Sequence, residues 1–196
     1  MRVTAGELKG RRLQAPAGRD TRPTSDRARS GLFDWLGPHF EGAQVLDLFA
    51  GSGALGIEAL SRGAHTVVFV ESARAALRTL RGNCRDLGVE QRVDIRPLDA
   101  AAALRALARE RASFDLVLAD PPYRSGLWAA LAQASDLVDI LGDEAVVIVE
   151  RARSEGPAEQ GGSRLTWRAA RSYGETAFDW YDVAPRGAEG DGESHD

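Results

Sequence analysis

Short apolar runs alternate with amphipathic segments through the middle of the chain. The runs have the length of buried strands, and the segments between them place their apolar residues on one helical face. The predicted strands cover residues 44–49, 66–70, 92–97, 114–119 and 145–149, and the predicted helices cover 54–61, 72–87, 99–111 and 127–137. Strands that alternate with helices in this way form a doubly wound, mostly parallel sheet. The pattern therefore predicts an α/β fold.

The N-terminal segment departs from this rhythm. Residues 2–5 and 12–15 flank a turn that contains Gly6 and Gly10, which predicts a small β-hairpin, and residues 16–26 are rich in turn formers. A helix should begin near Asp26, with Thr24 or Ser25 as its N-cap. The apolar residues on one face of this helix are Ala28, Leu32, Phe33 and Leu36.

The C-terminal segment departs from it as well. Residues 164–168 and 177–183 alternate polar and apolar positions around a turn at Gly174, which predicts an antiparallel hairpin at the edge of the sheet. Residues 185–196 are polar and acidic, and this composition predicts disorder. We therefore divide the chain into an N-terminal arm (residues 1–25), a main domain (residues 26–183) and an acidic tail (residues 184–196).

Length and composition indicate one globular domain. The chain has 196 residues, of which 43% are hydrophobic, and no apolar run approaches the roughly 20 residues that span a membrane. The first ten residues lack the apolar stretch of a secretory signal. Cys84 is the single cysteine, and no Cys/His cluster has the spacing of zinc ligands. We expect a cytoplasmic monomer with no metal and no membrane association.

Charge is distributed unevenly along the chain. The net charge is -4, but residues 1–40 hold eight basic and four acidic residues, which leaves -8 on the remainder. A basic segment on an acidic body predicts a local site for a polyanion, to which Arg11 and Arg12 would contribute. The alternative is a general preference for arginine, which accounts for 24 of the 25 basic residues.

A glycine-rich turn follows the first predicted strand of the sheet. Gly51, Gly53 and Gly56 have the spacing G-x-G-x-x-G where the strand passes into a helix. Glycine at such a junction lets the backbone approach a ligand closely. Glu71 follows Gly51 by 20 residues, which is also the spacing of a dinucleotide-binding fold. The pattern indicates a nucleoside-containing ligand without identifying it, and a turn needed only for packing is the alternative.

Acidic residues at three successive strand ends favour S-adenosylmethionine over a dinucleotide. Asp47 precedes the glycine turn, where a carboxylate would repel a diphosphate but would suit an ammonium and a sulfonium. Glu71 is placed to accept hydrogen bonds from ribose hydroxyls, and Asp99 lies at the end of the third strand, near the adenine. Asp99 could instead be a helix N-cap. The predicted cofactor site also includes Phe49, Ala50, Ser72 and Ala100.

The strand at residues 114–119 ends in the sequence Asp120-Pro121-Pro122-Tyr123. The lone pair of an exocyclic base amine is delocalised into the ring, and a carboxylate and a carbonyl that accept its hydrogens can direct it toward a methyl group. Asp120 is a plausible proton acceptor. The prolines lack N–H donors and stiffen the chain, and Tyr123 offers a face on which an extruded base can stack. A capped turn is the alternative in isolation, but the preceding glycine strand favours a catalytic tetrapeptide.

With these residues, the chain resembles the bacterial 16S rRNA guanine-N2 methyltransferases of the RsmD type. The resemblance covers about residues 1–183, and its most specific part is Thr-Arg-Pro-Thr-Ser-Asp-Arg at residues 21–27. The matching segments are residues 2–6, 9–11, 21–27, 47–56, 58–63, 69–71, 120–123, 149–150 and 173–174.

The resemblance implies a Rossmann-like class I methyltransferase fold for the main domain. It implies S-adenosylmethionine as methyl donor and a guanine of 16S rRNA as substrate, in free RNA or in the assembling small ribosomal subunit. It makes Asp47, Gly51 and Glu71 cofactor contacts and residues 120–123 the reactive site. It also implies that Arg22 and Arg27 face the RNA.

Three other functions remain open at this stage. An adenine-amine DNA methyltransferase can use the same tetrapeptide, although such enzymes carry a separate target-recognition region and this chain has only a short arm. An NAD-dependent oxidoreductase would share the glycine pattern, but the histidines available as acid–base catalysts are His39, His65 and His195, none of them near the predicted site. A non-catalytic RNA-binding module would not need residues 120–123.

Overall fold

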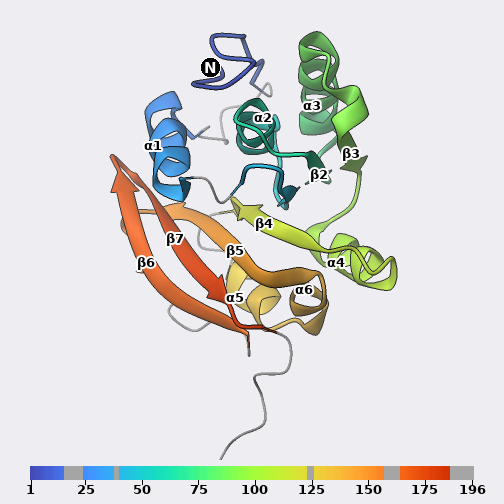
Figure 1. The fold of residues 1–196 in the computed structure, drawn as a ribbon, viewed down its shortest axis with the longest axis vertical. Helices are drawn as coiled ribbons and strands as arrows, with labels where there is room; N and C mark the ends of the chain where they lie inside the picture. The colour runs from blue at the N-terminus through green and yellow to red at the C-terminus, as the bar shows by residue number, and fades with distance from the viewer. Residues whose placement is uncertain (16–23, 38–39, 123–125, 157–163, 186–196) are drawn as a thin grey trace, which may run out of the picture.

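The computed structural model describes residues 1–15, 24–37, 40–122, 126–156 and 164–185. A seven-stranded sheet with the order β3-β2-β1-β4-β5-β7-β6 runs through its centre (Figure 1). The strands are β1 (Gln44–Asp47), β2 (Thr66–Val70), β3 (Val93–Arg96), β4 (Phe114–Ala119), β5 (Leu141–Ala152), β6 (Leu165–Tyr173) and β7 (Thr176–Val183). Strands β1 to β5 are parallel, whereas β7 pairs antiparallel with β5 and β6. The predicted parallel sheet with a C-terminal antiparallel hairpin is confirmed.

Helices cover both faces of the sheet. They are α1 (Asp26–Leu36), α2 (Ala54–Ser61), α3 (Arg74–Leu87), α4 (Ala100–Arg109), α5 (Leu127–Ala132) and α6 (Ser135–Asp139), with a 3-10 turn at Glu90–Arg92. Alternate residues of each strand point to opposite faces. Leu118 therefore packs in the core under α1, α2 and α3, while Val117 packs in the core under α4, α5 and α6. No helix in the described ranges is both long enough and apolar enough to span a membrane.

Several element boundaries differ from the predicted ones. The helix predicted over residues 127–137 is interrupted at Gln133 and Ala134, which gives α5 and α6. The helix predicted to begin at Ser72 begins at Arg74 with Ala73 at its N-cap, so Ser72 is not the cap. Strand β5 is longer than predicted because it pairs with β4 on one side and with β7 on the other, and pairing with β7 continues to Ala152.

The first 13 residues form the predicted hairpin in minimal form. Arg2 and Arg12 make one antiparallel bridge, and Val3 N–H donates to the carbonyl of Arg11 at 3.0 Å. Val3 and Leu13 are buried in the core shared by α1 and α2. Figure 1 shows this dark blue segment lying over α2. Gly6 allows the close approach, since a Cβ there would lie 1.6 Å from the Ser61 carbonyl oxygen. The hairpin is thus packed on the main domain.

Candidate active site

Four acidic side chains gather at the carboxyl edge of the parallel strands. Asp47 ends β1 and Glu71 follows β2, while Asp120 follows β4. Glu150 lies in β5 next to Val149, which pairs with Ala119, so Asp120 and Glu150 occupy adjacent positions on neighbouring strands. In a doubly wound sheet this edge is where ligands bind.

Three of these carboxylates share one face of the sheet. Asp47 pairs in register with Leu118, so Asp120 follows two positions later in the same alternation. Glu150 is likewise two positions after Ile148. Leu118 and Ile148 both pack in the core beneath α1, α2 and α3. The three carboxylates therefore belong to the face that the N-terminal half of the chain covers.

Asp47 is buried and only half satisfied. Its side chain is 1% exposed, and its Oδ2 accepts a hydrogen bond from Gly56 N–H at 3.0 Å, in the first turn of α2. Its Oδ1 is buried without a hydrogen-bond partner in the described part of the chain. Burial raises the pKa of Asp47 to about 7, against the effect of Gly56, and the charges of Asp120 and Glu71 add to the rise.

Glu71 shapes the glycine turn. Its Oε2 accepts from Gly51 N–H at 2.9 Å and its Oε1 accepts from Ala73 N–H at 2.7 Å, so one carboxylate joins the turn to the start of α3. Gly51 has φ 55°, in the left-handed region that favours glycine, and a Cβ at this position would face open space. Glu71 therefore fixes the turn through hydrogen bonds, and the side of Gly51 on which a Cβ would lie is open.

The predicted catalytic tetrapeptide, residues 120–123, begins in a buried environment. Burial raises the pKa of Asp120 to about 7. Pro121 is buried and Pro122 is exposed. Tyr123 lies outside the described residues, so its role as a stacking platform stays a prediction.

The other predicted cofactor residues lie along the same edge. Ala50 is buried and Phe49 is half-buried, next to Gly51, and Gly53 is the N-cap of α2. Ser72 is exposed beside Glu71. Asp99 Oδ1 accepts from Ala102 N–H at 2.8 Å, so Asp99 is the N-cap of α4, which was the alternative interpretation. Ala100 is buried in the first turn of that helix. No group of His, Cys, Asp and Glu side chains in the described ranges is arranged to hold a metal ion.

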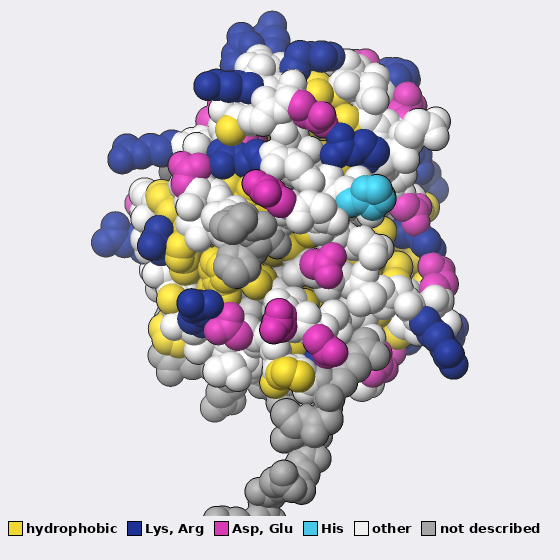
Figure 2. Space-filling model, in the orientation of Figure 1, with side chains coloured by type: hydrophobic (Ala, Val, Ile, Leu, Met, Phe, Trp, Pro, Cys, Tyr) yellow, Lys and Arg dark blue, Asp and Glu magenta, His cyan; other side chains and the backbone are white. Residues whose placement is uncertain are grey.

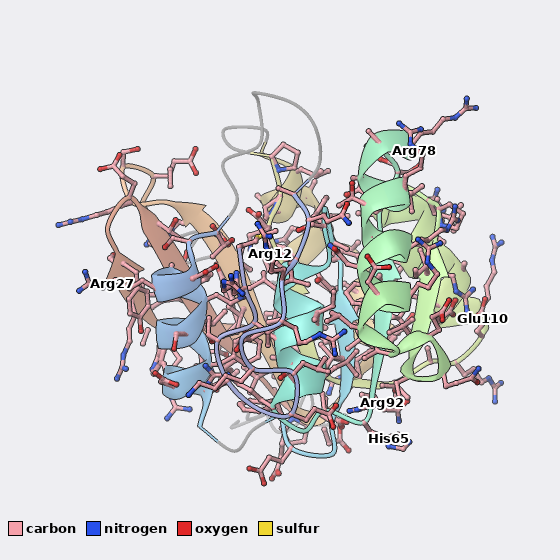
Figure 3. All side chains as sticks on the ribbon, turned by 90° about the horizontal axis from the view of Figure 1, so that it is seen from above. Arg12, Arg27, His65, Arg78, Arg92 and Glu110 are labelled. Atoms are coloured by element: carbon pink, nitrogen blue, oxygen red, sulfur yellow. The ribbon has the colours of Figure 1, made fainter. Side chains whose placement is uncertain are left out.

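The predicted RNA-facing arginines that the structure describes come from two different elements. Figure 3 shows Arg12 on the hairpin and Arg27 on α1, and both are exposed. Arg11 donates to the carbonyl of Asp86 at 2.5 Å, and Arg22 lies outside the described residues. Figure 2 shows Lys and Arg side chains concentrated over the upper part of one face, where the hairpin lies, with acidic side chains more numerous below.

Part of the basic charge counted in the first 40 residues is used inside the protein. Arg29, one of the eight basic residues counted in the first 40, is 0% exposed. Its Nε is 3.1 Å from Glu58 Oε2, and its Nη2 is 3.0 Å from Asp26 Oδ1. Glu58 also accepts from the backbone N–H groups of Thr4 at 2.9 Å and Ala5 at 3.1 Å. The predicted surplus of charge for RNA is smaller than the sequence count, and the hairpin has a structural role.

Two residues of this region were not predicted as functional. Glu150 entered only as part of a matching segment, and Thr24 only as a possible N-cap and as part of the motif at residues 21–27, yet the Thr24 hydroxyl donates to Glu150 Oε2 at 2.5 Å. The N-cap of α1 is Ser25, whose side chain accepts from Ala28 N–H. The position of Glu150 one step after a five-residue apolar run was the available signal, because strand ends at this edge carry the other acids.

Comparisons with known proteins identify the family to which the chain belongs. The family model described as Conserved hypothetical protein 95 matches residues 1–182. The chain is 38% identical to YlbH of Bacillus subtilis over 181 residues, which is 92% of this chain and 98% of YlbH. It is 38% identical to Ribosomal RNA small subunit methyltransferase D of Escherichia coli over 150 residues, which is 76% of this chain and 74% of that protein. The solved structure of a hypothetical protein from Thermus thermophilus superimposes with a TM-score of 0.78 at 28% identity, over 93% of this chain and 99% of the other.

Proposed function

The chain belongs to the RsmD-type methyltransferase family, described as Conserved hypothetical protein 95, and from this premise we propose that it methylates the N2 amine of a guanine in 16S rRNA. S-adenosylmethionine is the methyl donor, which supplies a methyl group on a positively charged sulfur. The substrate is the rRNA of the small ribosomal subunit, free or assembling. The main domain, residues 26–183, carries the chemistry, and the arm, residues 1–25, contributes to RNA binding.

One observation supports the cofactor above the others. The Oδ1 atom of Asp47 is buried without a partner in the described residues, and four residues later a Cβ on Gly51 would face open space. An uncompensated buried carboxylate costs free energy unless a cation approaches it. A donor with an ammonium and a sulfonium relieves that cost, whereas a diphosphate would increase it. The residues present therefore fit S-adenosylmethionine and disfavour NAD.

The chain's own residues divide the work of binding. Asp47 faces the cationic part of the ligand, and Gly51 lets the ligand approach the backbone. Glu71 fixes the turn through its two backbone hydrogen bonds and keeps lone pairs for ribose hydroxyls. Asp99 caps α4 with one oxygen, which leaves its other oxygen for the adenine side of the site.

Asp120 accepts the proton of the target amine. Bound S-adenosylmethionine would supply a methyl group whose bonding electron pair leaves with the sulfur, and Asp120 would take up the N–H proton that the methylated amine loses. Before transfer, Asp120 and a backbone carbonyl of the Pro-Pro segment orient the two amine hydrogens, since the prolines offer no competing N–H donor. Tyr123 stacks on the extruded base.

The test is transfer of labelled methyl groups from S-adenosylmethionine to small ribosomal subunits that lack the modification. Nucleoside analysis should show N2-methylguanosine as the labelled product, and free 16S rRNA and duplex DNA serve as parallel substrates. Labelled N6-methyladenosine, or transfer to DNA alone, would overturn the assignment of guanine and RNA. Binding of NAD without binding of S-adenosylmethionine would overturn the whole proposal.

A further inference from the structure

Glu150 is a buried carboxyl that the proposed chemistry leaves without a task. It is 1% exposed and lies near the end of β5, where it pairs with Phe178 of β7 one position after the last residue that pairs with β4. Its Oε2 accepts the hydroxyl of Thr24 at 2.5 Å, and its Oε1 is buried and has no hydrogen-bond partner among the described residues. A buried ionised carboxyl in this state would be strongly unfavourable.

Among the described residues, the neighbours of Glu150 supply no positive charge. Asp120 faces it from β4 and Asp47 from β1, and the hydroxyls of Thr24 and Thr176 face it from the segment before α1 and from β7. Within the described ranges, no Lys or Arg forms an ion pair with any of the three acids. The next residue along the strand, Arg151, pairs instead with Asp179 at 2.7 Å.

We propose that Glu150 is a positioning residue for methyl transfer, acting as the protonated member of a carboxyl pair in which Asp120 carries the negative charge. Adjacent parallel strands are about 4.8 Å apart, so the two carboxyls are too close for both to ionise without a large cost in a buried site. One proton shared between them removes that cost. Glu150 is the more buried of the two, which places the proton on Glu150.

The electrostatics of the site agree with this assignment. The pKa of Glu150 is raised to about 8, chiefly by burial. The charge of Asp120 and, less strongly, that of Asp47 also raise the pKa, while hydrogen bonds from the hydroxyls of Thr24 and Thr176 lower it. Burial raises the pKa of Asp120 only to about 7. Because the two groups interact, the pair titrates in two steps that belong to both residues. Between the two steps the pair holds one proton.

The pair has a consequence for the reaction, and this step rests on the proposed function. The target amine needs an anionic acceptor, and Asp120 can be anionic near neutral pH only if its neighbour stays neutral. Glu150 keeps its proton throughout the reaction and directs its O–H as a hydrogen-bond donor toward Asp120. It touches neither the base nor the methyl donor. Thr24, the fourth residue of the Thr-Arg-Pro-Thr-Ser-Asp-Arg motif at residues 21–27, orients Glu150 through its hydroxyl group.

The first test follows the carboxyl groups of the ligand-free protein by 13C NMR across the pH range. Wild type should show a shared titration with steps near 7 and 8. Asp120→Asn should leave Glu150 with a single step at lower pH, because the neighbouring charge is gone. Thr24→Val should raise the Glu150 midpoint by removing a hydroxyl donor, while Thr24→Ser, which keeps the hydroxyl, should not. A Glu150 midpoint below about 5 in wild type, near the ordinary value for glutamate, would overturn the pair.

The second test measures single-turnover methyl transfer against pH with Glu150→Gln and Glu150→Leu. Gln keeps an oxygen for Thr24 and an N–H for Asp120, so Glu150→Gln should retain at least tenfold more activity than Glu150→Leu. Glu150→Gln should also lose the change in methyl-transfer rate that wild type shows above about pH 8. Equal losses with unchanged pH profiles would overturn the positioning role. If wild type transfers no methyl group at all, the proposed function fails, and the NMR titration still decides whether the pair exists.

Discussion

Glu58 and Glu150 are both buried, at 0% and 1% exposure, and the protein treats them in opposite ways. Glu58 receives Arg29 at 3.1 Å and Arg62 at 2.9 Å, in addition to Thr4. Burial alone would raise the pKa of Glu58, but the hydrogen bonds of Thr4, Arg62 and Arg29 hold it below the ordinary value. In the described ranges Glu150 receives hydroxyl groups and no arginine: the Thr24 hydroxyl lies at 2.5 Å, the Thr176 hydroxyl also acts on it, and its pKa is raised to about 8.

The difference separates an acid that holds the fold from the acids to which we assign a role in the proposed site. Glu58 joins the N-terminal hairpin, α1 and α2, and its charge is neutralised within the protein. Asp47, Asp120 and Glu150 lie at the carboxyl edge of the sheet without an arginine partner in the described ranges. The chain can supply buried arginines, as Arg29 shows, so the lack of one at this edge is consistent with a site prepared for a cationic ligand.

The largest effect should come from breaking the paired region. Arg29→Met leaves Glu58 and Asp26 without their shared partner, and removing one member of a buried ion pair costs about 3–5 kcal/mol of unfolding free energy. Arg27→Met removes an exposed arginine from the same helix and should cost less than about 0.5 kcal/mol. Urea unfolding at neutral pH measures both. A loss below about 1 kcal/mol for Arg29→Met would contradict the structural role of Glu58.

The three acids at the carboxyl edge, which have no arginine partner in the described ranges, should make the free energy of unfolding depend on pH in a distinct way. The folded pKa values of Asp47, Asp120 and Glu150 are about 7, 7 and 8, above their ordinary values. A group with a raised folded pKa stabilises the fold below its unfolded pKa, and that contribution is lost as pH rises through the folded value. The free energy of unfolding should therefore fall between about pH 5 and 8. Replacing Asp47 by Asn and Glu150 by Gln together should flatten this fall by at least about 1 kcal/mol.

Glu58 should act in the opposite sense and in another range. Its lowered folded pKa contributes stability above the unfolded value, which is lost only as pH falls through the folded value. Stability curves recorded from pH 3 to 9 thus separate the two regions. A curve that rises between pH 5 and 8 in wild type would contradict the raised pKa values at the carboxyl edge.

Binding of S-adenosylmethionine should sharpen the comparison, because it should release protons from the acids at the carboxyl edge. A cation near Asp47 and Asp120 favours their ionised forms, so binding of S-adenosylmethionine near pH 7 should release protons. Affinity should then increase with pH between about 6 and 8, by up to about tenfold per unit for one proton released. Calorimetry in two buffers of different ionisation enthalpy measures the number of protons. An observed enthalpy that is the same in both buffers would contradict proton release.

The smallest effect concerns the arm and Arg27, which lies just after the arm in α1. Neutralising Arg11, Arg12, Arg22 and Arg27 should flatten the salt dependence of RNA binding, by about 0.7 in slope for each lost phosphate contact on single-stranded RNA. Affinity for S-adenosylmethionine should hardly change. Arg78→Gln on α3, an exposed arginine away from the arm, is the control (Figure 3). If the variant loses thermal stability and keeps its salt slope, the arm supports the core and does not dock RNA.

The sheet was predictable because its strands alternate with amphipathic helices. The glycine turn, Asp47, Glu71 and Asp120 all end strands or follow them, so local pattern was enough to place them at one edge. Asp99 shows the limit of such reasoning, since a strand-end acid and a helix N-cap have the same sequence context. The structure shows the cap and leaves the contact with adenine as a prediction.

The distribution of charge was not predictable in the same way. Arg29 counted as surface charge, because only the folded chain brings it to Glu58, 29 residues away, beneath the hairpin. Glu150 followed an apolar run that ended too early in the prediction, because the antiparallel pairing with β7 that extends β5 to Ala152 depends on a segment about 30 residues later. Both errors concern contacts between segments that are distant in the sequence, and the periodicity of apolar residues does not predict such contacts.

The role of Asp120 is tested most directly by Asp120→Ala in a single-turnover assay with labelled S-adenosylmethionine and small ribosomal subunits. Methyl transfer should fall by about 10²–10⁴-fold, the usual contribution of a general base, while calorimetry shows an affinity for S-adenosylmethionine within about threefold of wild type. Transfer at the wild-type rate, or loss of cofactor binding equal to the loss of activity, would contradict the assignment of Asp120 as the acceptor of the amine proton.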